Sequence, residues 1–203
     1  MNILFEDSRR GFTLLEALIS MAIGGLLIGA VVNTFIIQRK SYDIQEQVTE
    51  MVQTARAAMD MMTREIRMAG YDPTGAGFDG ISYDSAKLQV EADLRGDNPS
   101  DPPDGDTQDS NENIAYRYDP APDFQIDRNT GGGNQPFAEN IDSFVFACLN
   151  GNGNPTTINA DIRQVRLTVT ARTAKPDPHY SANGGYRTYT LSSLITPPNL
   201  ACP

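Results

Sequence analysis

Residues 9–37 read RRGFTLLEALISMAIGGLLIGAVVNTFII, and this stretch decides how the chain begins to fold. From Phe12 to Ile37 the run is 26 residues long, and Glu16 is its only charged residue. As an α-helix it would extend about 39 Å, more than the roughly 30 Å hydrocarbon core of a bilayer. A buried helix in a soluble domain of this size is rarely so long or so apolar on every side. The stretch therefore predicts a membrane-spanning helix.

The residues on either side of this run argue against a secretory signal peptide. Such a peptide is cut after its apolar stretch, beside small residues, whereas this chain continues as QRKSYDIQEQ after Ile37. Before the run, a short polar leader ends in Gly11, and Glu16 is the fifth residue after that glycine. The basic pair at residues 9–10 is matched by another at residues 39–40, so charge does not determine the orientation.

The sequence GFTLLEALIS at residues 11–20 resembles the processing motif of type IV prepilins and type II secretion pseudopilins. The resemblance implies that a prepilin peptidase cuts between Gly11 and Phe12 and methylates the new amine of Phe12, leaving 192 residues. It also implies a single-pass inner-membrane protein with a periplasmic C-terminal domain, which later joins an extracellular pilus or a periplasmic pseudopilus. The implied partners are the peptidase, other minor pilins, the major pilin and inner-membrane platform proteins.

Glu16 needs a partner, because a carboxylate inside a membrane helix is costly and marks a functional site by default. With the motif around it, we expect an assembly contact in which Glu16 neutralises the N-terminal amine of a neighbouring subunit's Phe12. The alternative is that Glu16 lies close enough to the helix end to reach the lipid headgroups. A carboxylate is also favourable in the first turn of a helix, through the helix dipole.

The helical pattern continues from Ser41 to Ala69 as an amphipathic stripe. Apolar residues recur there at steps of three and four, namely Ile44, Val48, Met51, Val52, Ala55, Met59, Met62, Ile66 and Ala69. Gly70, followed by Tyr-Asp-Pro, supplies a stop signal, so one helix is expected over residues 12–69. A long coiled coil would explain the stripe, but its Met and Ala content favours packing on a following sheet.

The stretch MTREIRMAGYDP at residues 62–73 resembles the end of the long helix in PilW-type minor pilins, with type II secretion pseudopilin J as the nearest competitor. The chain is therefore divided into a leader at residues 1–11, a transmembrane and assembly half-helix at 12–40, and an amphipathic half-helix at 41–70. A periplasmic β-rich domain follows at residues 71–203.

Strand signals follow the helix. Alternating or β-rich stretches occur at residues 80–83, 87–92, 113–118, 142–149, 162–172 and 186–195. The expected class is α+β: a pilin-like fold in which a long N-terminal α-helix packs on a C-terminal antiparallel β-sheet domain.

Residues 93–113 form an acidic loop, DLRGDNPSDPPDGDTQDSNEN. Oxygen ligands at short spacing around a tight glycine turn suit Ca²⁺, which makes the loop a candidate calcium site although it fails the EF-hand spacing. The candidate ligands are Asp101, Asp104, Asp106, Asp109 and Glu112. The alternative is a solvated acidic loop without metal, and no other cofactor is expected.

Cys148 and Cys202 are the two cysteines, and an even count in an exported chain suits one disulfide. A bridge would close about 55 residues and restrain the unfolded chain by about 3–4 kcal/mol in the entropy model. Two free thiols are the alternative.

No catalytic motif is evident, and the single histidine, His179, stands in a proline-rich connection, so an enzyme is not expected. A net charge of −10 argues against a nucleic-acid partner. The leading hypothesis is a minor pilin of a type IV pilus that acts in pilus assembly and initiation near the tip. The alternatives are a J-like minor pseudopilin of a type II secretion system and a membrane-anchored adhesive module.

Overall fold

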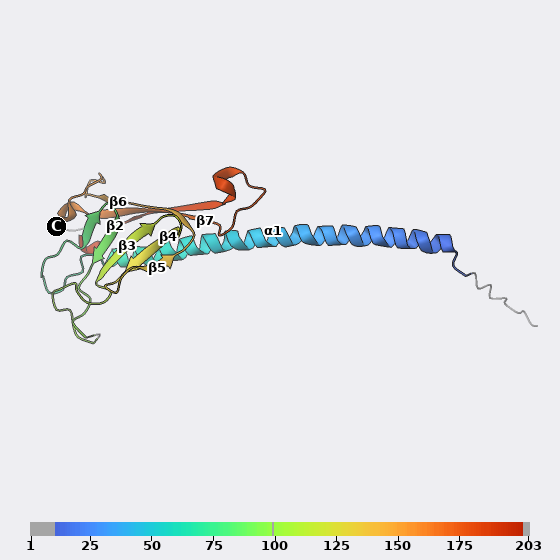
Figure 1. Ribbon diagram of the computed structural model, residues 1–203. Helices are drawn as coiled ribbons and strands as arrows, with labels where there is room; N and C mark the ends of the chain where they lie inside the picture. Colours follow the sequence, from blue (N-terminus) through green and yellow to red (C-terminus); the bar gives the residue numbers. More distant parts are fainter. Residues whose placement is uncertain (1–10, 99, 201–203) are drawn as a thin grey trace, which may run out of the picture. The chain divides into compact units, whose positions relative to one another are not determined.

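A computed structural model of the chain describes residues 11–98 and 100–200. Within these residues one long helix is followed by eight β-strands and three short 3₁₀-helices (Figure 1). The chain divides into two compact units, Met1–Gln45 and Glu46–Pro203, each described by itself below. The predicted α+β class, with a long N-terminal helix and antiparallel strands after it, is confirmed.

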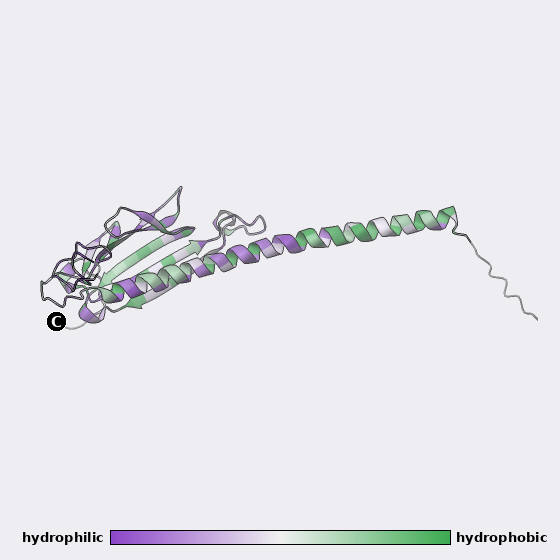
Figure 2. Ribbon diagram, turned by 90° about the horizontal axis from the view of Figure 1, so that it is seen from below, coloured by the Kyte–Doolittle hydropathy of each residue, from purple (hydrophilic) through white to green (hydrophobic). Residues whose placement is uncertain are grey.

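The long helix is α1 (Leu14–Met68). Figure 2 shows a largely apolar first half and an alternation of polar and apolar residues further along. The helix ends where the stop signal predicts, since Gly70 has a φ of +72°, in the left-handed region that favours glycine. The predicted and observed boundaries differ by two residues at the start and one at the end.

The first sheet of the second unit is a five-stranded antiparallel meander in the order β1-β2-β3-β4-β5. Its strands are β1 (Ile81–Asp84), β2 (Lys87–Glu91), β3 (Asn113–Asp119), β4 (Gln125–Asn129) and β5 (Gln135–Ala138). The last two were not predicted. β4 alternates weakly because charged residues follow Ile126, and β5 contains Pro136, which is tolerated because β5 is an edge strand.

The second sheet has three antiparallel strands in the order β6-β7-β8. They are β6 (Ile141–Leu149), β7 (Gln164–Arg172) and β8 (Thr188–Ile195), all predicted from the sequence. The central strand β7 buries every second residue, from Val165 to Ala171, as its alternation predicts. The strands of the domain thus form two antiparallel sheets.

The part of α1 that belongs to the second unit supplies one side of its core. The buried residues of α1 form one stripe and pack in a single cluster with residues of both sheets. These helical residues are Met51, Ala55, Ala58, Met59, Met62 and Ile66. The stripe is thus covered by strands of its own chain, which confirms packing on the sheets over a coiled coil.

A polar group also connects α1 to the five-stranded sheet. The carboxylate of Glu65 on α1 accepts a hydrogen bond from the Tyr116 hydroxyl of β3 and pairs with the Arg128 guanidinium of β4 at 2.7 Å. Tyr116 is fully buried, and its burial, followed by its hydrogen bond to Glu65, raises its pKa well above the ordinary value. Each of these three groups therefore has a charged or polar partner inside the domain.

The end of α1 is held against β1 and β2 by close backbone contact. The amide of Gly70 donates to the carbonyl of Glu91 at 2.9 Å, and the amide of Glu91 donates to the carbonyl of Gly80 at 2.8 Å. Gly80 has a φ of +75°, and a Cβ added there would lie 2.6 Å from the Cα of Gly70. Only glycine fits at residue 80 without moving the end of the helix.

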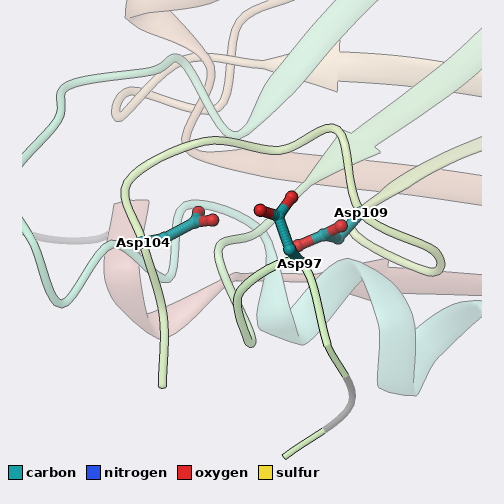
Figure 3. Close-up of side chains that lie close together, drawn as sticks. All are labelled: Asp97, Asp104 and Asp109. Atoms are coloured by element: carbon teal, nitrogen blue, oxygen red, sulfur yellow. The ribbon is translucent and has the colours of Figure 1, made fainter. Parts of the chain in front are cut away.

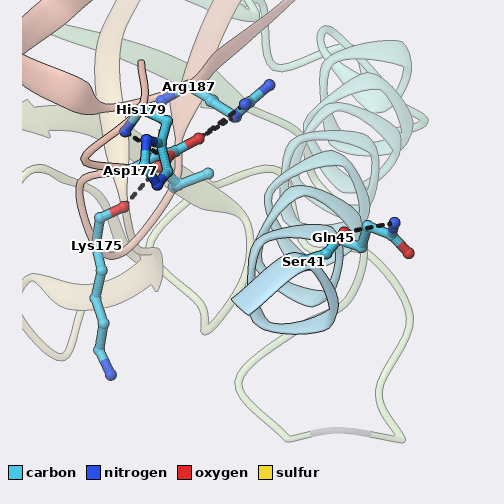
Figure 4. A network of polar contacts seen from close by, with 7 residues as sticks. Ser41, Gln45, Lys175, Asp177, His179 and Arg187 are labelled. Atoms are coloured by element: carbon cyan, nitrogen blue, oxygen red, sulfur yellow. Dashed lines mark hydrogen bonds and ion pairs between the residues drawn. The ribbon is translucent and has the colours of Figure 1, made fainter. Parts of the chain in front are cut away.

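The connection between β7 and β8 is organised by Asp177 (Figure 4). Its buried carboxylate accepts hydrogen bonds from the Arg187 guanidinium at 2.8 Å and from the His179 amide at 2.9 Å. The hydrogen bond from Arg187, followed by that from the His179 amide, lowers the pKa of Asp177. His179 thus takes part in the turn through its backbone.

Candidate functional site

The predicted processing site lies just before α1. Gly11 has open space around it, and the Phe12 side chain is 82% exposed. The leader, residues 1–10, lies outside the described residues. The predicted scissile bond therefore joins two exposed residues that precede the regular helix.

Thr13 begins the helix, a role that was not predicted from the sequence. Its hydroxyl oxygen accepts a hydrogen bond from the Glu16 amide at 3.3 Å, and its carbonyl accepts one from the Ala17 amide at 3.2 Å. Thr13 and Glu16 thus have the spacing of a capping box, with Glu16 in the first helical turn. The signal was present in the sequence as Thr-x-x-Glu before an apolar run.

The helix after this cap presents its apolar side chains outward. Most of the large side chains between Phe12 and Ile37 are more than half exposed, as Leu26 is at 75% and Phe35 at 64%. By length and composition α1 could cross a bilayer, and no residue in its most apolar stretch is buried. The side chain of Glu16 is also exposed. Contiguous exposed apolar surface of this kind marks a membrane or protein contact.

The acidic loop brings together some of its predicted ligands. Carboxylate oxygens of Asp97, Asp104 and Asp109 lie within 4.8 Å of one another (Figure 3), and so do those of Asp106, Asp109 and Glu112. Four of the five predicted ligands are therefore in these groups, together with Asp97, which was not predicted.

The fifth predicted ligand, Asp101, is in neither group. Its carboxylate instead accepts a hydrogen bond of 2.7 Å from the Asn98 side chain. Asp101 and Asp104 are close in the sequence, but their carboxylates have different neighbours. That of Asp104 lies with those of Asp97 and Asp109, whereas that of Asp101 bonds to Asn98.

Cys148 is buried at the end of β6, and burial raises the pKa of its thiol to about 11. Its predicted disulfide partner, Cys202, lies outside the described residues, so the bridge stays a prediction.

Comparison with known proteins is informative at the N-terminus. Residues 7–32 match a protein-family model described as the prokaryotic N-terminal methylation motif. A search of curated protein sequences found no match. Among solved structures, the chain is similar to a type IV-like pilin, TTHA1219 from Thermus thermophilus, at 13% identity and a TM-score of 0.47. That alignment covers 74% of this chain and 98% of the other. The N-terminus of this chain therefore carries the prokaryotic N-terminal methylation motif, in line with its resemblance to type IV prepilins.

Proposed function

We propose that this chain is a minor pilin of a type IV pilus, acting in pilus assembly and initiation near the tip. The observation that carries the proposal is the methylation motif placed at the start of an exposed apolar helix. Such a helix suits two surroundings in turn: the bilayer before assembly, and the packed helices of other subunits afterwards. The resemblance of residues 62–73 to PilW-type minor pilins supports the finer assignment.

Processing is the first step of the proposed mechanism. The prepilin peptidase cuts between Gly11 and Phe12 and methylates the amine of Phe12. The exposure of both residues, and their position ahead of the first helical turn, support access to this bond. The β-rich unit stays on the periplasmic side until the subunit enters the filament.

Assembly is the second step, and Glu16 is its key residue. As the subunit leaves the bilayer, the carboxylate of Glu16 pairs with the positive N-terminal amine of a neighbouring subunit. Thr13 satisfies the Glu16 amide, so the backbone of this turn is already paired before a neighbour arrives. A charge pair formed in an apolar surrounding neutralises two charges that would each be costly alone. Other minor pilins, the major pilin and the inner-membrane platform are the proposed partners.

Mass spectrometry of the mature protein tests the processing step. We expect an N-methylated Phe12 at the terminus, whereas an intact Met1 or a cut after Ile37 would contradict it. Glu16→Ala tests assembly, with Glu50→Ala as the matched control because Glu50 is an exposed acid further along the same helix. We expect Glu16→Ala to insert in the membrane normally yet to be lost from purified filaments.

A strain that lacks this protein distinguishes the three candidate functions. A minor pilin predicts loss of surface pili and of twitching, while a pseudopilin predicts loss of protein secretion with pili unchanged. An adhesive module predicts normal pili and secretion with weaker attachment to surfaces. Loss of secretion alone, or of attachment alone, would overturn the proposal.

A further inference from the structure

The loop from Asp93 to Glu112 concentrates negative charge that the rest of the domain does not neutralise. It contains seven acidic residues and one basic residue, Arg95. The guanidinium of Arg95 donates to the carbonyl oxygen of Ser110. Among the described residues the ion pairs are Glu65–Arg128 and Asp177–Arg187, and neither includes an acid of this loop.

Two of these acids are buried and hold the loop together. Glu112 is 1% exposed, and its Oε1 accepts hydrogen bonds of 2.8 Å from the amides of Leu94 and Arg95. Asp93 is fully buried, and its Oδ2 accepts a hydrogen bond of 3.0 Å from the amide of Gly105. These two carboxylates therefore hold the backbone at Leu94, Arg95 and Gly105 in place by accepting hydrogen bonds from it.

The second oxygen of Glu112 points to a ligand. Its Oε2 is buried and receives no hydrogen bond within residues 11–98 and 100–200, and the same is true of the Oδ2 of Asp109. A buried carboxylate oxygen without a donor is costly, and each such atom needs a specific explanation. Glu112 also contributes an oxygen to the group with Asp106 and Asp109. A cation at this position would satisfy the buried oxygens and the clustered charges together.

Asp109 is the acid around which the carboxylates of the loop gather. Asp109 belongs to both carboxylate groups, so it lies where they join. Mutual repulsion among clustered carboxylates is relieved by a bound divalent cation.

We propose that this loop binds Ca²⁺ through Asp106, Asp109 and Glu112, with Asp97 and Asp104 completing the carboxylate shell. Ca²⁺ fits better than Mg²⁺ because it accepts six to eight oxygen ligands in irregular, flexible geometry, whereas Mg²⁺ requires a near-ideal octahedron and keeps most of its water. Binding fixes the loop to the end of α1, since the Asp93 amide donates to the Tyr71 carbonyl at 2.8 Å. The site does not depend on the proposed function in pilus assembly.

Isothermal titration of the full chain in detergent micelles, first stripped with a chelator, tests the proposal with CaCl₂ and then with MgCl₂. We expect a Kd for Ca²⁺ of about 10⁻⁴ to 10⁻³ M, the range of extracellular calcium modules, and much weaker binding of Mg²⁺. Hydrogen exchange should show Ca²⁺-dependent protection of the Leu94, Arg95 and Gly105 amides, with no change in the strands of the second sheet.

Asp109→Asn and Glu112→Gln should each weaken Ca²⁺ binding by about tenfold or more. Asp101→Asn is the matched control, because it removes the same charge from the same loop but from outside the carboxylate groups. It should change the affinity by less than about twofold. Glu112→Gln could disturb the fold of the loop, because the Glu112 carboxylate accepts hydrogen bonds from two loop amides. Asp109→Asn does not remove those hydrogen bonds, so it tests Ca²⁺ binding separately from loop folding. Absence of Ca²⁺ binding in the native chain, or an equal loss in Asp101→Asn, would overturn the proposal.

Discussion

The two parts of α1 are both helical, but their apolar side chains are exposed in one part and buried in the other. In the first unit, up to Gln45, large apolar side chains such as Leu26 are exposed. In the second unit, Met62 and Ile66 on the same helix are fully buried against strands of their own chain. The difference shows that a helix rich in apolar residues on all sides needs a partner from outside, while a striped helix is covered by its own domain.

Truncating one isoleucine in each part of α1 is the most direct test of this difference in burial. Ile66→Ala should lower the free energy of unfolding by about 2–5 kcal/mol, because it leaves a cavity in the core. Ile28→Ala should leave that free energy almost unchanged, because Ile28 is 66% exposed. Urea unfolding of the full chain in detergent, followed by the near-ultraviolet circular dichroism of its tyrosines, measures both. An equal loss from Ile28→Ala would contradict the comparison.

Glycines give a second matched pair with a smaller expected effect. Gly80→Ala should cost about 1–3 kcal/mol from backbone strain alone, because of its positive φ and the nearby Cα of Gly70. A Cβ added at Gly25 in the first unit would meet no neighbouring atom. Gly25→Ala should therefore raise helix stability by about 0.5–1 kcal/mol, because alanine favours the helix more than glycine does. The same urea titration reports Gly80→Ala, and far-ultraviolet circular dichroism in micelles reports Gly25→Ala. A neutral Gly80→Ala would show that the end of α1 is not tightly packed.

Removing one hydroxyl from each part should have a smaller effect still. Tyr116→Phe removes the hydrogen bond that its hydroxyl donates to the carboxylate of Glu65, while the pair with Arg128 stays, and should cost about 1–2 kcal/mol. Tyr42→Phe in the first unit should cost nothing measurable, because Tyr42 is 70% exposed. If Glu65→Gln cost the same in the Tyr116→Phe background as in the native chain, the two groups would not be coupled.

The smallest effect is expected from acid titration of the second unit. The lowered pKa of Asp177 means that its pairing with Arg187 stabilises the fold above the ordinary aspartate range, around pH 3.8 and higher. That stabilisation is lost as the pH falls through the folded pKa, because protonation removes the charge. Asp177→Asn should therefore flatten the acid side of the stability profile. A profile unaltered by Asp177→Asn would show that the pair contributes little.

Local patterns in the sequence predicted more of this fold than long-range ones did. The length and end of α1, and six of the eight strands in the described residues, follow from periodicity and from Gly70. β4 and β5 were missed because pairing with β3 and with each other stabilises them, and neither has a strong pattern of its own.

The sites show the same limit. The group formed by Glu65, Tyr116 and Arg128 joins residues 51 and 63 positions apart, which no local pattern can indicate. In the acidic loop, composition indicated the ligand type, but the turns determine that Asp97 replaces Asp101 beside Asp104. The cap at Thr13, in contrast, was readable as Thr-x-x-Glu and was overlooked.

The position of that cap has a consequence for the timing of maturation. Thr13 stands two residues after Gly11, so a cut behind Gly11 leaves the hydrogen bond that starts the helix untouched. Proteolysis would then change the charge at the chain terminus without refolding the first turn. Folding and maturation are decoupled in such an arrangement. A precursor waiting in the membrane and a processed subunit ready for export would share one helix and differ only at its tip.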